Sequence, residues 1–175
     1  MISAVAVILG FASYAFVMLS LFRLFRVNYF NPIVKIFATY LEPVSKNLFF
    51  FLPPLFAAIA LALVLKFASF YLAYSSGYET LTLFYLSVID ILNSGFRILF
   101  YCVIGSVVLS WVAPGNSHPL LQLIEEISAG ILSPIRKFLP PMGGLDFTPI
   151  IGLLVLNLIN TSFIQLFVLC YENSI

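Results

Sequence analysis

The sequence has few charged residues. Only 9% of its 175 residues are Asp, Glu, Lys or Arg, against about 25% in an ordinary soluble domain. Hydrophobic residues make up 62% of the chain, which is more than a soluble core of this length can bury. This composition excludes a soluble globular domain. The eight basic and seven acidic residues leave a formal net charge of +1. Binding to phosphate backbones needs a strong basic excess, so nucleic acid is not an expected partner.

Cysteine and histidine are also scarce. Cys102 and Cys170 lie inside apolar stretches without a CxxC spacing, and we expect both to be small buried hydrophobic residues. The single histidine, His118, has no further ligands at a metal-binding spacing, so we expect a solvated residue at a helix start. The adjacent carboxylates Glu125 and Glu126 would point about 100° apart on a helix, as parts of a solvated face.

The common motifs of catalytic sites are missing as well. The sequence contains no GxSxG nucleophile elbow, no Walker-type GxxxxGK[ST] loop and no GxGxxG fingerprint. A second histidine that could activate a serine is also absent. We therefore expect no enzymatic activity, no cofactor and no metal site.

The sequence does contain long hydrophobic runs. Four of them are long enough, at about 1.5 Å per helical residue, to cross a hydrocarbon layer of about 30 Å. The first is followed, not preceded, by the basic residues Arg23 and Arg26, so we expect a retained helix and not a cleaved signal peptide. The predicted spans are residues 2–22, 55–74, 91–112 and 149–171. The connections 27–54, 75–90 and 113–148 are too polar or too interrupted by proline to span.

Basic residues indicate the side of the membrane on which each connection lies, because cytoplasmic loops are enriched in Lys and Arg. Outside the predicted spans, all basic residues lie on one side: Arg23, Arg26, Lys35, Lys46, Arg136 and Lys137. We therefore expect both long connections to face the cytoplasm. Both termini and the connection 75–90 would then lie on the outer, periplasmic side.

The order of prolines and hydrophobic runs occurs twice. Residues 31–54 and 118–141 each run from a polar residue and a proline, through an amphipathic stretch, to a Leu-Pro-Pro tripeptide. The pattern predicts an all-α membrane protein with four transmembrane helices in two tandem repeats, residues 1–85 and 86–175. Each repeat would consist of a span, a proline-bounded interfacial amphipathic helix and a second span.

Prolines also mark expected helix boundaries. Asn31, Ser133 and Thr148 are good N-cap residues and each precedes a proline, so we expect a helix to start at each of them. The pairs at 53–54 and 140–141 favour extended turns before the second and fourth spans.

The amphipathic stretches have helical periodicity. Apolar residues recur on one face between Ile33 and Val44 and between Leu120 and Ile131, with polar residues opposite. Only lipid or the spans can bury these faces, so the stretches are predicted to be interfacial or re-entrant helices.

The second half carries a longer motif. Residues 133–150 read SPIRKFLPPMGGLDFTPI. This segment resembles the YggT family, also called YlmG, whose signature combines a basic SPIR-type turn, an LPP-x-GG-x-D stretch, a Ser/Thr-Pro pair and an apolar span. The first half resembles a degenerate copy without the GG-x-D segment. The motif positions in this chain are Ser133, Pro134, Arg136, Lys137, Pro140, Pro141, Gly143, Gly144, Asp146 and Pro149.

The resemblance implies a small bacterial inner-membrane protein with plastid relatives. Members of the family are linked to tolerance of osmotic stress, to organisation near the division machinery and, in plastids, to assembly of a haem-bearing cytochrome. The resemblance implies no catalytic residue. His118 alone would offer a single axial haem ligand, so haem binding is not expected.

Ionisable residues lie inside or beside the predicted spans. Because a charge inside a membrane is costly, we expect Asp90 to neutralise Lys66 or Arg97 in an intramembrane polar cluster, in which Asp90, Asn93 and Arg97 share one helix face. The residues of this cluster are Lys66, Asp90, Asn93, Arg97, Asn160 and Gln165. Alternatively, Lys66 and Arg97 extend to the outer headgroups and Asp90 lies in water.

Two classes of function fit these features. The first is a non-enzymatic membrane protein that helps envelope or membrane complexes to assemble, with the lipid bilayer and other membrane proteins, or a homo-oligomer, as partners. The alternative is a small oligomeric ion channel or transporter component, which the repeat and the intramembrane charges would suit.

Overall fold

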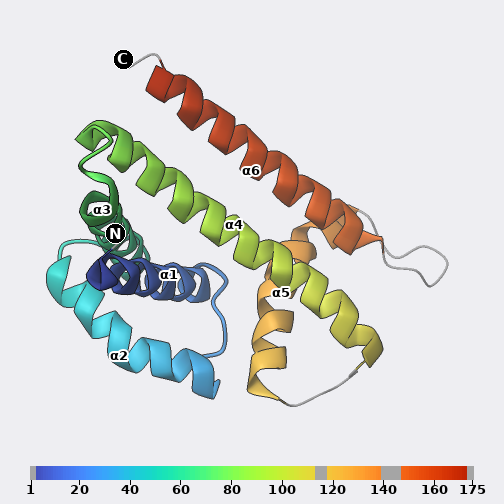
Figure 1. Cartoon of the computed structure of the whole chain (residues 1–175). Coiled ribbons are helices and arrows are strands. Elements are labelled where there is room, and N and C mark those ends of the chain that lie inside the picture. Colours follow the sequence, from blue (N-terminus) through green and yellow to red (C-terminus); the bar gives the residue numbers. More distant parts are fainter. Residues whose placement is uncertain (1–2, 113–117, 139–146, 173–175) are drawn as a thin grey trace.

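The computed structural model of the protein describes residues 3–112, 118–138 and 147–172, and all regular structure in these ranges is helical. Figure 1 shows the six helices. They are α1 (Ala4–Leu24), α2 (Pro32–Leu48), α3 (Pro54–Tyr74), α4 (Thr80–Val112), α5 (Pro119–Phe138) and α6 (Thr148–Glu172). The prediction of an all-α fold is confirmed for the described residues.

Four of these helices, α1, α3, α4 and α6, are long and apolar enough to cross a membrane. They agree with the four predicted spans except at the start of α4. That helix has 33 residues and begins at Thr80, so the prediction that residues 75–90 form a non-spanning connection is wrong for residues 80–90. Polar residues predicted the end of the span, but the Ser87 hydroxyl donates a hydrogen bond to a backbone carbonyl and Asp90 forms an ion pair, so their polarity does not interrupt the helix.

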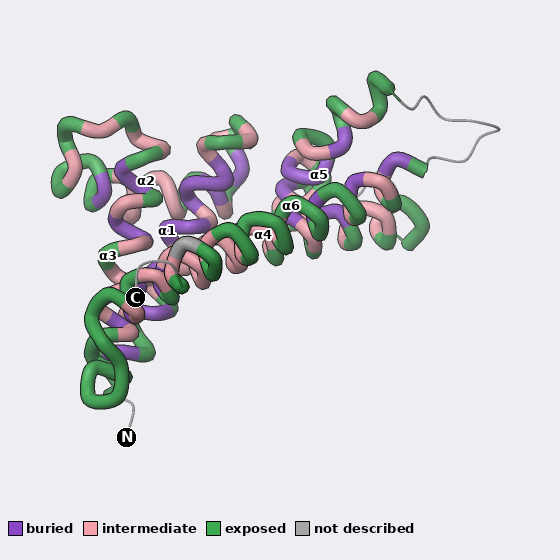
Figure 2. Tube along the Cα trace, turned by 90° about the horizontal axis from the view of Figure 1, so that it is seen from above, coloured by how far each residue is buried: buried purple, intermediate pink, exposed green. Residues whose placement is uncertain are grey.

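The spans associate as two pairs. α1 makes its most extensive contact with α3, and α4 runs beside α6 (Figure 1). The start of α1, the connection from α3 to α4 and the end of α6 lie towards one end of the helices, and α2 and α5 lie towards the other (Figure 2). We call these the turn end and the amphipathic end. Both halves have the same element order, but the proposed duplication of residues 1–85 and 86–175 stays a prediction.

α1 and α3 pack closely through small residues. Gly10 leaves room for α3, because a Cβ atom at this position would lie 3.2 Å from Ser69 Oγ. The Ser69 hydroxyl donates a hydrogen bond of 2.7 Å to the carbonyl of Ala6. In membranes, such close backbone approach and interhelical hydrogen bonding replace the hydrophobic driving force of soluble cores.

The predicted cap at Asn31 is present, whereas one predicted helix start is wrong. Asn31 Oδ1 accepts a hydrogen bond of 3.0 Å from the Ile33 amide, and Pro32 occupies the first turn of α2. α6 begins at Thr148, as expected. Pro134, however, lies inside α5, so Ser133 does not start a helix. A proline near a helix end removes only one hydrogen bond, and the packing of α5 outweighs that loss.

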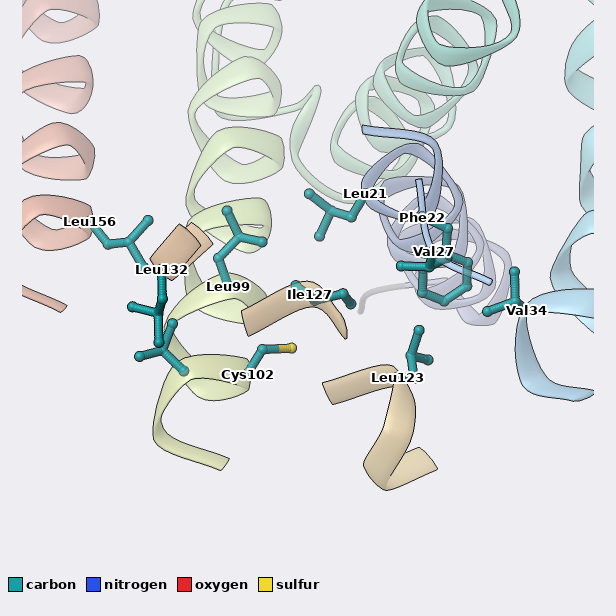
Figure 3. Packing of buried hydrophobic residues seen from close by; sticks show 11 residues of the cluster. Leu21, Phe22, Val27, Val34, Leu99, Cys102, Leu123, Ile127, Leu132 and Leu156 are labelled. Carbon is teal, nitrogen blue, oxygen red and sulfur yellow. The ribbon is translucent and has the colours of Figure 1, made fainter. Parts of the chain in front are cut away.

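A hydrophobic core joins the two halves at the amphipathic end (Figure 3). Leu123, Ile127 and Leu132 of α5 are buried in it against α1, α2, α4 and α6. Cys102 belongs to the same core and is 8% exposed, which confirms the prediction that it is a small buried residue. The side chain of Cys170 lies outside what the structure describes.

Ion pairs hold α2 in place, one of them with α1. Glu42 forms ion pairs with Arg23 of α1 and with Lys46 one turn further along α2. Partial burial favours the neutral carboxyl group, but the hydrogen bonds and charges of Lys46 and Arg23 together outweigh it and lower the pKa of Glu42. Burial raises the pKa of Tyr29, over whose ring the Arg23 guanidinium lies at 5.2 Å.

The Gly10→Val variant should lose about 1–3 kcal/mol of unfolding free energy, because the added methyl groups would push α1 away from Ser69. Thermal unfolding in detergent, followed by circular dichroism, measures the loss. Gly95→Val is the matched control, since a Cβ atom there meets nothing within 4 Å. Equal stability of the two variants would contradict close packing of α1 against α3.

The Glu42→Gln variant should lose about 1–2 kcal/mol at neutral pH, since the amide cannot replace the ionised carboxylate. The folded pKa lies below the ordinary value of 4.5, so this stabilisation is complete above pH 4.5 and is lost as the pH falls through the folded pKa. Unfolding of both proteins across this pH range tests the prediction. Parallel pH profiles would disprove the role of Glu42.

Candidate functional site

Three helices meet at an intramembrane ion pair. Lys66 Nζ of α3 lies 2.8 Å from Asp90 Oδ2 of α4. Tyr14 of α1 lies between them: its hydroxyl accepts a hydrogen bond of 3.0 Å from Lys66 and donates one of 3.3 Å to Asp90. We call Tyr14, Lys66 and Asp90 the triad.

The three residues of the triad lie at similar depth. Along their helices, Lys66 is about 12 Å from Tyr74, and Tyr14 and Asp90 are about 15 Å from Ala4 and Thr80 respectively. All three distances are measured from the turn end, and half of a hydrocarbon layer is about 15 Å thick. The triad therefore lies near the middle of the predicted membrane region.

Aromatic rings cover the lysine. The Lys66 ammonium lies 4.4 Å from the ring centre of Tyr14 and 4.8 Å from that of Phe70. Lys66 is 5% exposed, so its side chain does not extend to the headgroups. The Asp90 side chain is 32% exposed. The electrostatic attraction and the ring faces compensate for the removal of the ammonium from water.

A hydrogen bond extends the polar cluster to the fourth span. Asn160 Nδ2 of α6 donates 3.0 Å to Asn93 Oδ1, which lies one helical turn from Asp90 on α4. The structure thus connects four of the six predicted residues: Lys66, Asp90, Asn93 and Asn160.

The other two predicted residues stand apart from this network. Arg97 and Gln165 are both exposed, on α4 and α6. Among the described residues, no acidic group forms an ion pair with Arg97. Arg97 lies at the centre of α4, 17 residues after Thr80.

Two cavities flank the triad. One of about 430 Å³ is lined by Asp90, Asn93 and the aromatic residues Phe70, Tyr74 and Tyr78. The other, of about 180 Å³, is lined by Lys66 and Tyr14 and shares Phe70 and Tyr74 with the first. An ion pair of zero net charge in such a position can hold three helices together.

Sequence reasoning missed several polar partners. Tyr14 resembles any aromatic residue of a lipid-facing helix, and only its depth, equal to that of Lys66, could have revealed it. Glu126 was expected on a solvated face, but its carboxylate accepts a hydrogen bond of 2.8 Å from the Asn28 amide after α1. His118 is exposed at the start of α5, where its Nδ1 accepts a hydrogen bond from the Leu120 amide, as expected for a helix start.

The described positions of the sequence motif lie near a separate polar cavity at the amphipathic end. This cavity of about 550 Å³ is lined by Arg136, Pro149 and Glu125, and by Ser106 and Ser128, whose hydroxyls are 2.7 Å apart. Ser133, Pro134 and Lys137 are exposed on α5. The motif positions Pro140, Pro141, Gly143, Gly144 and Asp146 lie outside the described residues.

Comparison with known proteins gives one family. The model of the family described as CCB3/YggT matches residues 85–167. No solved structure matches the chain.

Several bacterial proteins are similar over most of the chain. An uncharacterised protein of Pseudomonas aeruginosa is 34% identical over 147 residues, which cover 79% of this chain and 75% of that protein. An uncharacterised protein of Haemophilus influenzae is 30% identical over 81% of this chain and 78% of its own length. The Escherichia coli protein YggT is 38% identical over 63 residues, which cover 36% of this chain and 33% of that protein.

Lys66→Met and Asp90→Asn should each lower the unfolding free energy by about 1–3 kcal/mol, because each leaves the other charge without its partner. The double variant should lose less than the sum of the two. Unfolding titrations in detergent micelles measure this coupling. Additive losses would mean that the pair contributes no interaction energy of its own.

Proposed function

The chain belongs to the CCB3/YggT family, and we propose that it is a non-enzymatic protein of the bacterial inner membrane that helps other membrane proteins to assemble and stay organised. The proposal includes two tandem repeats and termini on the periplasmic side, with α2 and α5 at the cytoplasmic surface. The observation that carries it is the joining of α2 and α5 into one surface layer.

Two contacts between the halves build this layer. Asn31 Nδ2, at the start of α2, donates a hydrogen bond of 2.7 Å to the carbonyl of Pro119 at the start of α5. Glu126 of α5 binds the Asn28 amide just before α2. The two amphipathic helices are therefore joined to each other near their starts, as well as packed against the spans.

The exposed side chains of the layer suit a membrane surface. Ile36, Tyr40 and Leu48 of α2 are 58%, 71% and 59% exposed, and an apolar row of this kind can insert into the interface between headgroups and acyl chains. Lys35 and Lys137 are exposed on the same two helices. Each basic residue near an anionic surface contributes about 1 kcal/mol of attraction. The layer can thus hold a fixed position at the bilayer surface and dock an acidic partner.

The test compares assembly with transport. The tagged protein, expressed at its native level, should co-purify after crosslinking with a defined larger complex. The Lys35→Glu/Lys137→Glu variant should remain in the membrane but lose most of that complex, because both docking charges are reversed. Glu79→Lys, at the turn end of the molecule, is the matched control and should retain it.

Transport by the purified protein would contradict the proposal. Liposomes that contain only this chain should show no ion or solute flux above that of empty liposomes. Specific flux would favour the channel or transporter function instead. Loss of the complex in the Glu79→Lys control as well would show that the layer of α2 and α5 is not the docking surface. A deletion strain that is sensitive to osmotic stress should be rescued by Glu79→Lys but not by the double variant.

A further inference from the structure

Arg97 is an unusual residue in this fold because it is exposed at the centre of an apolar helix. It lies seven residues beyond Asp90, and therefore about 10 Å further along α4 from the turn end. This position is still inside the hydrocarbon region. Arginine at such a depth carries a large cost unless it has a partner.

The direction of α4 makes it harder for the Arg97 side chain to reach the nearer membrane surface, which is at the amphipathic end. The helix runs from the turn end to the amphipathic end (Figure 1). Because Cα–Cβ bonds tilt towards the helix N-terminus, the side chain of Arg97 starts back towards the middle of the membrane. The phosphate groups of both leaflets lie beyond the hydrocarbon region, so they are poor partners for this residue.

A polar groove surrounds Arg97. A cavity of about 280 Å³ between α4 and α6 is lined by Arg97, Tyr101, Asn157 and Asn160, together with Asn93 and aromatic and aliphatic side chains. Tyr101 is 63% exposed and Asn157 is exposed. Asn160 Oδ1 is buried and accepts no hydrogen bond from the described residues. We call these five polar residues the α4–α6 groove.

The polar character continues along α6. Asn157, Thr161 and Gln165 are spaced four residues apart, which places them on one side of the helix, and all three are exposed. Polar side chains on a transmembrane helix form interhelical hydrogen bonds in most known cases. The structure gives none of these three side chains a hydrogen bond among the described residues, so they are available to a helix outside the chain.

We propose that the α4–α6 groove receives a transmembrane helix of another protein, and that this helix carries an Asp or Glu at the depth of Arg97. The carboxyl group pairs with the guanidinium, and neighbouring small or polar residues of the partner meet the row of Asn157, Thr161 and Gln165. This inference deepens the proposed function, since it names the partner class of an assembly factor.

A second copy of this chain fits the groove less well. Asp90 is the described acidic residue nearest to Arg97 in depth, about 10 Å closer to the turn end, and it is already engaged by Lys66. The other described acidic residues lie outside the apolar spans or at their ends: Glu42, Glu79, Glu125, Glu126 and Glu172. Two copies that meet at this groove would bring two arginines together without a carboxylate for either.

A defined peptide tests the groove. The purified chain, labelled with a donor dye, is reconstituted in liposomes of uncharged phosphatidylcholine with an acceptor-labelled 21-residue Leu/Ala helix that has one Glu about 10 Å from its midpoint, to match the depth of Arg97. Energy transfer should indicate association about 5- to 30-fold stronger than for the same peptide with Leu at that position. A peptide with Lys at that position should bind no better than the Leu peptide.

Variants of the groove provide the controls. Arg97→Met should abolish the preference for the Glu peptide, and Arg97→Lys should keep part of it. Arg26→Met removes an exposed positive charge outside both the groove and the docking surface, and it should leave the preference for the Glu peptide unchanged. Equal binding of the Glu and Leu peptides, or a preference that survives in Arg97→Met, would overturn the proposal.

If a second copy of the chain or a lipid occupies the α4–α6 groove, the experiments give different results. Energy transfer between two labelled copies of the chain that is lost in Arg97→Met would make the groove a self-association surface and overturn the proposal. Displacement of the Glu peptide by added anionic phospholipid would make it a lipid site, with the same consequence. Because the peptide assay needs no cellular partner, it can fail while the complex of the proposed function still co-purifies, and the reverse can also occur.

Discussion

The fold depends on the pairing of Lys66 with Asp90 through Tyr14. In lipid, apolar side chains gain little by leaving acyl chains for another helix, so polar contacts decide which helices meet. The ion pair joins α3 to α4, the two helices between which the chain passes from one half to the other. Tyr14 brings α1 to the same point. The hydrogen bond between Asn93 and Asn160 then adds α6. The four spans are thus connected by contacts that lipid cannot replace.

Beyond this centre, the two halves of the molecule are packed differently. Half of the most apolar window of α1 is buried, whereas the share is 11% for α4 and for α6. α1 and α3 form a close pair with small residues at their contact, whereas a cavity lined by polar residues lies between α4 and α6. One half therefore supplies rigidity, and the other presents most of its surface to the membrane.

The sequence predicted the spans and the cap at Asn31 because these features depend on local composition and on neighbouring residues. Prediction from the sequence failed where the local structure depends on a contact with a residue far away in the chain. Residues 80–90 looked too polar to join a span, but Asp90 is neutralised by a lysine from another helix, so its polarity does not end α4. Pro134 looked like a helix start, but the burial of Ile127 and Leu132, which precede it, holds α5 against the core. Tyr14 and Glu126 acquire their roles only through contacts 76 and 98 residues away.

Among the residues that the structure describes, the charges inside the spans do not balance. Lys66 and Asp90 cancel each other, and this pair is complete in the folded molecule. Arg97 adds a further positive charge that no described acidic residue neutralises and that the pair does not need. Folding of the chain and neutralisation of its membrane region are therefore separable: the first is achieved by internal contacts, and the second requires a group from outside. A protein built in this way is held together by its own contacts, and it gains electrostatic energy when a complementary helix binds.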